Sequence, residues 1–394
     1  MPLDIPAIQQ ALKAEGLDGW LLYDFHGSNP IAARLVGTSE SGKMTTRRWF
    51  YLIPATGEPK GLVHAIERKT LDALPGQKTA YAGRQQLDAE LTRLLAGMNT
   101  IAMEYSRECA IPYISRIDAG TIELVRKRGV EVQSSGDLVQ RFEAVWDDQA
   151  LATHRDASAA LYRIKDRAFE TAAKAVRDGS HITEFDVQQQ MAGWFKDEGL
   201  VSDSDPVVAA QENAGDPHYL PTAKKARAIR ANELLLLDLW GKKKDDPKAV
   251  YADITWVGFT GTTVPSDMAR AFQAIRNARD AAAALAQESA RDERDLRGWQ
   301  VDRAARSVLE QAGYGERILH RTGHNLGRDV HGNGVHMDDY ESHDDRRLLP
   351  GTGFTIEPGL YFESFGVRTE INVYYGRREA LITGPVQTEI LRLL

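Results

Sequence analysis

The stretch "VRTEINVYY" (residues 367–375) has the apolar, β-branched and aromatic composition of a β-strand, yet Glu370 stands in its middle. An ionised carboxylate in an apolar interior is costly even after the protein relaxes around it. The same feature occurs in "LLLLDLW" with Asp238, in "VYADITW" with Asp253 and in "GFTIEPG" with Glu357. This repetition in the second half of the chain indicates that the four acids have a common function.

The composition narrows the possible classes of protein. The 394 residues predict two or three domains with a sizeable core. With 49 basic against 56 acidic residues, the net charge of −7 argues against general nucleic-acid binding and gives no membrane signature. Cys109 is the only cysteine, which excludes an intramolecular disulfide and a thiolate metal site, and we expect it in or near the core.

The first residues, "MPLDIPAIQQALKAEGL", lack a basic segment followed by an apolar stretch, so they do not match a signal peptide. No apolar stretch approaches the roughly 20 residues that a membrane-spanning helix needs. We therefore expect a cytoplasmic protein without membrane partners.

The pattern of the chain predicts two domains, residues 1–150 and residues 151–394. The first alternates short helices and strands in an α/β manner, whereas the second begins with long amphipathic helices and continues into apolar strands. Helices followed by antiparallel strands are typical of the α+β class. The sequence contains no P-loop and no dinucleotide fingerprint. The long helices are expected at 157–179, 183–199, 266–290 and 297–313.

The spacing of the four acids predicts that they meet in pairs. Asp238 and Asp253 lie on apolar runs joined by the polar segment "GKKKDDPKAV", which predicts a β-hairpin with both side chains on one face. Glu357 and Glu370 flank "PGLYFESFGVRT", which can also fold back as a hairpin. A lone strand carboxylate is more often bonded to backbone N–H groups, but four acids together require more than one positive charge. The strands contain no lysine, so divalent metal ions, which favour oxygen ligands, are the economical partners.

Three histidines precede the two glutamates in "HRTGHNLGRDVH": His320, His324 and His331. A single buried histidine is usually a hydrogen-bonded core residue, but this cluster favours one imidazole as a ligand and the others as donors to a substrate. A carboxylate-rich site with one histidine and two metal ions suits hydrolysis, because the ions lower the pKa of a bridging water and polarise the carbonyl under attack. A carboxylate such as Glu357 can accept the proton of that water.

These segments, in the order "LLDLW…YADIT", "HRTGHNLGRDVH", "FTIEPGLYF" and "GVRTEIN", resemble the pita-bread metallopeptidases. This superfamily contains methionine aminopeptidase, aminopeptidase P, prolidase and creatinase. The resemblance covers roughly residues 155–394, while the first 150 residues look like the creatinase-type N-terminal domain. It implies an α+β protein: a C-terminal pita-bread fold, with an antiparallel sheet flanked by helices, after a smaller α/β domain.

The resemblance also implies a role for each acid. Asp238 would bind one metal ion, Asp253 and Glu370 would bridge both ions, and His324 and Glu357 would hold the second. Glu357 would in addition handle the proton of the attacking water. The two divalent ions would be Mn²⁺, Co²⁺ or Zn²⁺.

Further positions match substrate-side residues of the family. By this resemblance His331 and His218 would take part in catalysis, while His320, Tyr361 and Arg368 would contact substrate or support the site. The sequence departs from the family in a longer hairpin after Asp238, in Trp240 where glycine is usual, and in the loop "HGNGVHMDDYESHDDRR". We expect His336 and His343 in this loop to be solvated, with substrate contact as the alternative.

The expected function is a dinuclear metal-dependent exopeptidase that cleaves short peptides, with Xaa-Pro bonds as the expected target. Dipeptidase and aminopeptidase activities remain open, as do a carboxypeptidase variant, a metal-free creatinase-like C–N hydrolase and a non-catalytic binding module. The resemblance further implies a homodimer.

Overall fold

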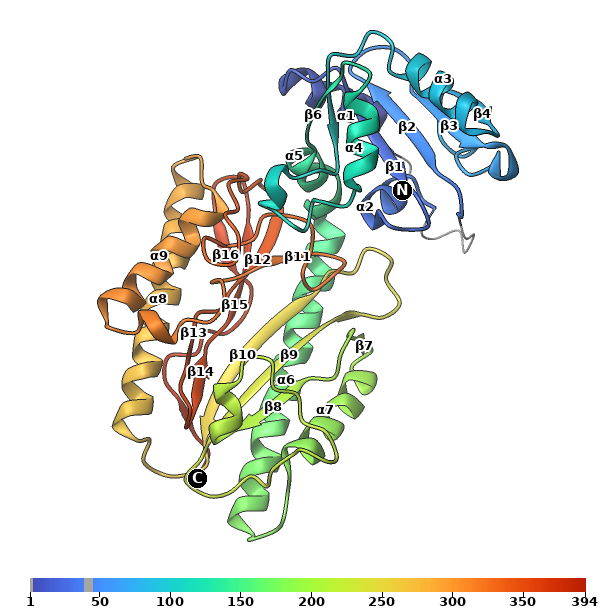
Figure 1. The fold of residues 1–394 in the computed structure, drawn as a ribbon. Coiled ribbons are helices and arrows are strands. Elements are labelled where there is room, and N and C mark those ends of the chain that lie inside the picture. Colours follow the sequence, from blue (N-terminus) through green and yellow to red (C-terminus); the bar gives the residue numbers. More distant parts are fainter. Residues whose placement is uncertain (1–2, 39–44) are drawn as a thin grey trace. The chain divides into compact units, whose positions relative to one another are not determined.

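The computed structural model describes residues 3–38 and 45–394, and it divides into two compact units, Met1–Glu143 and Ala144–Leu394 (Figure 1). Each unit has hydrophobic clusters of its own. The units are therefore described separately.

The N-terminal unit is built on a mixed sheet with the strand order β4-β3-β2-β1-β5-β6 in its described part. The strands are β1 Gly19–Asp24, β2 Trp49–Pro54, β3 Lys60–His64, β4 Gln77–Tyr81, β5 Thr100–Met103 and β6 Glu131–Ser134. The helices are α1 Ile5–Ala14, α2 Pro30–Leu35, α3 Arg84–Leu94, α4 Ala119–Arg126 and α5 Gly136–Val139.

Strand β1 is buried along its whole length, because helices cover both faces of this sheet. Trp20 and Leu22 belong to the cluster that includes Ile8 of α1, whereas Leu21 belongs to the cluster that includes Leu87 of α3. A strand buried on both faces is expected to be a continuous hydrophobic run.

The C-terminal unit combines long helices with antiparallel strands. Its helices are α6 Asp148–Arg177, α7 Glu184–Asp197, α8 Ser266–Arg291 and α9 Gly298–Gln311. Its described strands are β7 Leu200–Val201, β8 Val207–Ala210, β9 Leu234–Lys243, β10 Ala252–Phe259, β11 Asn325–Leu326, β12 Thr352–Ile356, β13 Gly359–Tyr361, β14 Gly366–Arg368, β15 Ile371–Tyr375, β16 Ala380–Ile382 and β17 Leu391–Arg392. They form the sheets β17-β10-β9-β7, with β8 also on β9, then β11-β12-β15-β16 and the pair β13-β14.

The hairpin β9–β10 has two different faces, and Figure 1 shows α6 passing behind it while α8 and α9 lie together at the other edge of the unit. Leu235, Leu237 and Leu239 pack in the cluster that includes Leu161 of α6. The alternate residues Leu234 and Leu236 pack instead in the cluster that includes α8 and the C-terminal strands. Because side chains alternate along a strand, the even-numbered residues of β9 face this second cluster.

Two sequence-based expectations about the fold are wrong. The segment 367–375 is not one strand, because Thr369 and Glu370 lie in a break between β14 and β15. At this break the Glu370 N–H donates to the carbonyl of Thr255 on β10, 3.2 Å away, so the backbone pairs with another sheet. Cys109 is exposed and has a φ of 54°, instead of lying in the core.

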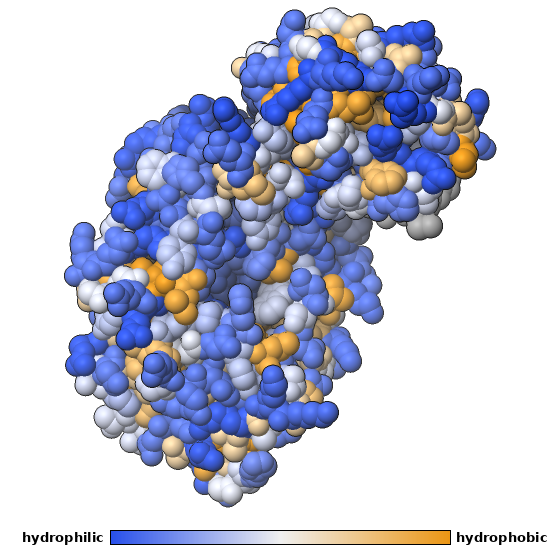
Figure 2. All heavy atoms as spheres, viewed as in Figure 1, coloured by the Kyte–Doolittle hydropathy of each residue, from blue (hydrophilic) through white to orange (hydrophobic). Residues whose placement is uncertain are grey.

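The visible surface carries mainly hydrophilic residues, and Figure 2 shows the hydrophobic ones in small separate patches. Within the described residues, no helix combines the length and the apolar character needed to cross a membrane.

Candidate metal centre

The β9–β10 hairpin brings the two aspartates to one face. In its register Asp238 lies opposite Thr255, and Asp253 lies opposite Trp240. Residues directly opposite each other in an antiparallel pair, and residues two apart on one strand, share a face. Asp238 and Asp253 are therefore diagonal neighbours, on the face that points away from α6.

The two glutamates stand where the chain passes from one sheet to another. Glu357 follows β12, and Glu370 precedes β15, whose Ile371 pairs with Ile356 of β12. The backbone N–H of Glu357 donates to the carbonyl of Thr322 at 2.7 Å. The strands β13 and β14 between the glutamates form the expected hairpin.

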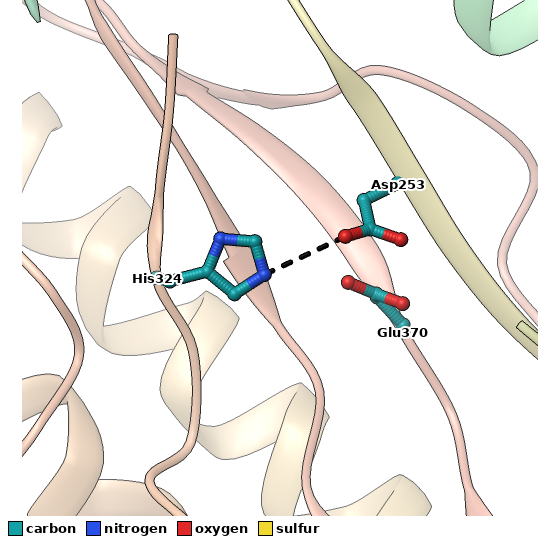
Figure 3. A group of neighbouring side chains, drawn as sticks. All are labelled: Asp253, His324 and Glu370. Carbon is teal, nitrogen blue, oxygen red and sulfur yellow. Dashed lines mark ion pairs between the residues drawn. The ribbon is translucent and has the colours of Figure 1, made fainter. Parts of the chain in front are cut away.

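Asp253, His324 and Glu370 form the centre of the site. Their side chains point toward one another in Figure 3, and one ligand atom from each lies within 4.8 Å of the others. His324 Nε2 is 3.5 Å from Asp253 Oδ2 and 3.1 Å from Glu357 Oε1. Asp253 Oδ1 and Glu370 Oε1 are buried without a hydrogen-bond partner among the described residues.

Asp238 is engaged differently, since its Oδ2 accepts a hydrogen bond from Arg368 Nη2. The same guanidinium donates from Nε to Thr255 Oγ1 at 3.0 Å and from Nη1 to the Tyr361 hydroxyl at 3.1 Å. Its Nε lies 4.0 Å from Glu357 Oε2. Arg368 is buried, so a substrate carboxylate would have to displace one of these partners. Arg368, on strand β14, thus supplies part of the positive charge near the acids. The sequence analysis considered only lysine as a source of this charge.

Burial and crowding change the proton affinities of the acids. Burial, followed by the charges of neighbouring acids, raises the pKa of Asp253 and of Glu370 well above their ordinary values. Burial also raises the pKa of Asp238, although Arg368 opposes the shift. For Glu357, burial acts upward, but the hydrogen bond from His324 and the nearby positive charges lower its pKa overall. Without an added cation, the acids of the centre cannot all be ionised at low cost.

Two further histidines border the centre. The ring of His331 lies edge-on to that of His324 with 4.3 Å between centroids, and the charge of His324, followed by burial, lowers the pKa of His331 to about 3. His320 Nε2 lies 2.7 Å from the Tyr361 hydroxyl, which links it to Arg368. Burial lowers the pKa of His320.

The other predicted histidines differ in their surroundings. His218 is exposed on a loop, and its charge contributes to the lowered pKa of His331. His336 is buried, so the expectation of a solvated ring is wrong: its Nδ1 accepts a hydrogen bond from the backbone N–H of Asn325 at 3.2 Å. His343 is exposed as expected, with Nδ1 2.7 Å from Asp339.

Two threonines of the site were missed at the sequence level. Thr255 Oγ1 donates to Glu370 Oε2 at 2.9 Å, and Thr355 Oγ1 donates to Glu357 Oε1 at 3.0 Å. Each stands two residues from an acid, in "ADIT" and "FTIE", so the two-residue period of a strand could have revealed them.

Comparison with known proteins identifies the family. The model of metallopeptidase family M24 matches residues 157–376. The chain belongs to family M24. Over 212 residues it is 34% identical to an Xaa-Pro dipeptidase of Lactobacillus helveticus, which covers 52% of this chain and 51% of the relative. This chain thus matches about half the length of that relative.

Solved structures share the fold of this M24 chain. The dipeptidase PepE of Mycobacterium ulcerans superimposes with a TM-score of 0.74 at 22% identity, covering 100% of both chains. The prolidase of Pyrococcus horikoshii OT3 gives a TM-score of 0.60 at 19% identity, covering 98% of this chain and 99% of the prolidase. The predicted pita-bread superfamily and fold are confirmed.

The residues of this candidate centre fit a divalent cation. An imidazole nitrogen and two carboxylates converge, and two buried carboxylate oxygens are without partners among the described residues. Oxygen-rich donors with one imidazole suit divalent first-row metals. The fit is direct for Asp253, His324 and Glu370, whereas Asp238 and Glu357 are bonded to Arg368 and His324.

Proposed function

We propose that this M24 protein is a metal-dependent exopeptidase that hydrolyses short peptides, with Xaa-Pro bonds as its main target. The observation that carries the proposal is the convergence of Asp253, His324 and Glu370, with buried carboxylate oxygens that lack a partner in the described residues. The named activity of the Lactobacillus helveticus relative, an Xaa-Pro dipeptidase, supports the choice of substrate.

We assign five residues to the binding of two divalent ions: Asp238, Asp253, His324, Glu357 and Glu370. Bound ions would act as Lewis acids that polarise the scissile carbonyl and favour ionisation of the attacking water. Asp253 and Glu370 are the candidates for bridging, because they lie at the centre of the group and each has an oxygen without a partner in the described chain. At a second ion Asp238 would offer its Oδ1, while its Oδ2 accepts the hydrogen bond from Arg368.

Glu357 would transfer the proton of the attacking water. Its Oε1 faces His324, and Thr355 donates a hydrogen bond to the same oxygen, which holds the carboxylate in one orientation. In that orientation it can accept a proton from the attacking water and deliver it to the leaving amine.

Three other groups would bind and orient the peptide. His331 would donate a hydrogen bond from a ring N–H to the carbonyl oxygen. His218 would approach the substrate from its exposed loop. His320 and Tyr361, hydrogen-bonded to each other, would line the adjoining wall while Arg368 orients Asp238.

A peptide panel tests this function. Peptides with free or blocked termini and with proline at each position are incubated with protein and Mn²⁺, before and after chelation, while elemental analysis counts bound metal. Chelator-sensitive cleavage beside proline at a free terminus supports the proposal. Cleavage of a C–N bond by metal-free protein would favour a creatinase-like hydrolase, and bound metal without turnover would favour a binding module. Release from the carboxyl end would indicate a carboxypeptidase.

The identity of the metal, Mn²⁺, Co²⁺ or Zn²⁺, and a homodimer remain predictions from the resemblance, and a cytoplasmic location remains a prediction from the sequence pattern. Light scattering that shows a monomer would contradict the last of them. The assignment of residues 1–150 as a creatinase-type domain is likewise proposed.

A further inference from the structure

A buried carboxylate outside the metal centre holds the loop that carries His218. Glu184 is the first residue of α7, and its side chain is completely buried. Four donors converge on it: the backbone N–H groups of Ala210 and Arg227, the amide of Asn213 and the hydroxyl of Tyr219, at 2.5 to 3.0 Å. Ala210 ends β8, and the other three donors lie in the connection between β8 and β9.

Residues 211–219 of this connection are here called the His218 arm. The arm contains His218 next to Tyr219, whose hydroxyl bonds to Glu184 Oε2. The His218 side chain is exposed, and the local contact that orients its backbone is the N–H donating to Asp216 Oδ1 at 2.9 Å. The position of the imidazole therefore depends on how the arm is anchored.

The arm also packs on the hairpin that bears Tyr361 and Arg368. Gln211 Nε2 donates to the carbonyl of Ser364 at 3.0 Å. At Gly366 an added Cβ would lie 1.8 Å from the carbonyl oxygen of Ala214, so the two backbones are in close contact. Glu184 on one side and the β13–β14 hairpin on the other thus hold the arm, and Arg368 of the same hairpin bonds to Asp238 of the candidate centre.

We propose that Glu184 is a positioning residue for substrate binding, which acts by anchoring the His218 arm. The inference rests on the proposed peptidase function, because it assigns the arm to the peptide-binding side of the same site. Glu184 touches none of the proposed metal ligands in the contacts of the described structure. Its loss should therefore weaken substrate binding and leave metal binding unchanged.

The decisive variant is Glu184→Gln, which keeps the size of the side chain but replaces an acceptor oxygen with an NH₂ group. In either orientation this NH₂ would face hydrogen-bond donors, so the anchor is broken. With Ala-Pro and Mn²⁺ we expect KM to rise about tenfold and kcat to stay within about twofold, the size expected for one hydrogen bond to a charged group. Hydrogen exchange of residues 211–219 should become faster, while Mn²⁺ affinity, measured by calorimetry, should not change.

Two further variants control the experiment. Tyr219→Phe removes one of the four donors and should give a smaller change in the same direction, which keeps the test valid if Glu184→Gln does not fold. Asp186→Asn alters a carboxylate on the same helical turn. Its Oδ2 accepts hydrogen bonds from the N–H and the hydroxyl of Thr183, the N-cap of α7, and it has no recorded hydrogen bond to the arm in the described structure. It should leave KM and the exchange of the arm unchanged, although it weakens the start of α7.

The outcomes separate the anchoring role from the enzyme activity. Unchanged exchange of the arm in both Glu184→Gln and Tyr219→Phe would overturn the proposal, whatever the kinetics. Faster exchange with an unaltered KM would overturn the role in substrate binding. If the wild-type protein cleaves no peptide, the proposed function fails, and the exchange data alone then support or overturn the anchor.

Discussion

The two units of the chain each bury carboxylates, but they surround them differently. In the N-terminal unit Glu104 is completely buried just after β5, and its oxygens accept hydrogen bonds from Trp20, Asn29 and Ser135. In the C-terminal unit Asp253 and Glu370 each keep one buried oxygen without a partner among the described residues, and other acids lie beside them. Burial of an acid is therefore no evidence of a metal site by itself.

The difference lies in what raises the pKa. Burial raises the pKa of Glu104 to about 7, and its hydrogen bonds act against that shift. For Asp253 and Glu370 burial is reinforced by neighbouring carboxylates. One isolated acid can be neutralised by a proton, whereas a group of converging acids with unpaired oxygens offers ligands to a cation.

The largest expected effect comes from Glu370→Gln. In metal-loaded protein this variant should lose metal occupancy, and its activity should fall by more than about a hundredfold. Mutation of a residue that only supports a metal ligand already lowers metal affinity or activity about 10–100-fold. In metal-free protein the same change should raise the melting temperature, because it removes a buried acid crowded by Asp253. Elemental analysis, peptide hydrolysis and calorimetric melting check the three expectations. Normal metal content and turnover would refute the assignment of Glu370.

Glu104 should make the stability of the protein depend on pH. The folded state holds this proton more tightly than the unfolded state, whose pKa is near 4.5, so the stabilisation is complete below about pH 4.5 and disappears as the pH rises through about 7. The loss is on the order of 3 kcal/mol. Urea unfolding at pH 5 and pH 8 should show that the difference between the wild type and Glu104→Gln changes by most of this amount. Glu123→Gln, at an exposed position of α4, is the control, and an equal change there would contradict the explanation.

Glu184→Gln should affect the stability of the metal-free protein in the opposite direction to Glu370→Gln. It replaces one oxygen of a carboxylate that accepts hydrogen bonds from four donors, so we expect the free energy of unfolding to fall by about 2 kcal/mol. Thermal unfolding of the two variants side by side measures the contrast. A shift of the melting temperature in the same direction in both variants would contradict the distinction between a buried acid held by hydrogen bonds, such as Glu184, and a buried acid proposed to bind metal, such as Glu370.

The smallest effect is expected for Thr255→Val. This variant removes the hydroxyl that donates to Glu370 and accepts from Arg368, so Mn²⁺ affinity should fall about tenfold, the lower end for residues that support a metal ligand. Competition with a chelator measures it. Thr153→Val, a buried threonine whose hydroxyl bonds to Ala150 of α6, is the matched control and should leave the affinity unchanged.

The sequence predicts much of the fold correctly because its signals are local. The helices expected at 266–290 and 297–313 appear as Ser266–Arg291 and Gly298–Gln311, since their apolar residues recur with the helical period. The β9–β10 hairpin follows from two apolar runs around a polar turn. The helix expected at 157–179 begins earlier, at Asp148, where the Asp147 side chain caps it.

The same local reasoning overlooked buried acids in the first half of the chain. Glu104 follows the apolar strand of "NTIAMEY", and Asp24 ends that of "GWLLYD", as in the segments of the second half. Both are buried, and Asp24 accepts hydrogen bonds from the backbone of Gly27 and Asn29. Sequence pattern alone does not separate them from Asp253 and Glu370.

The sequence by itself determined which segments become helices and strands, and that Asp238 and Asp253 share one face. Only the tertiary structure decided which buried acids find donors, that Arg368 neutralises Asp238, and that the chain breaks between β14 and β15 at Glu370. The physical reason is range: periodicity acts over a few residues, whereas the Arg368–Asp238 and Thr255–Glu370 contacts join residues 130 and 115 positions apart. Such partners are chosen by the packing of whole sheets.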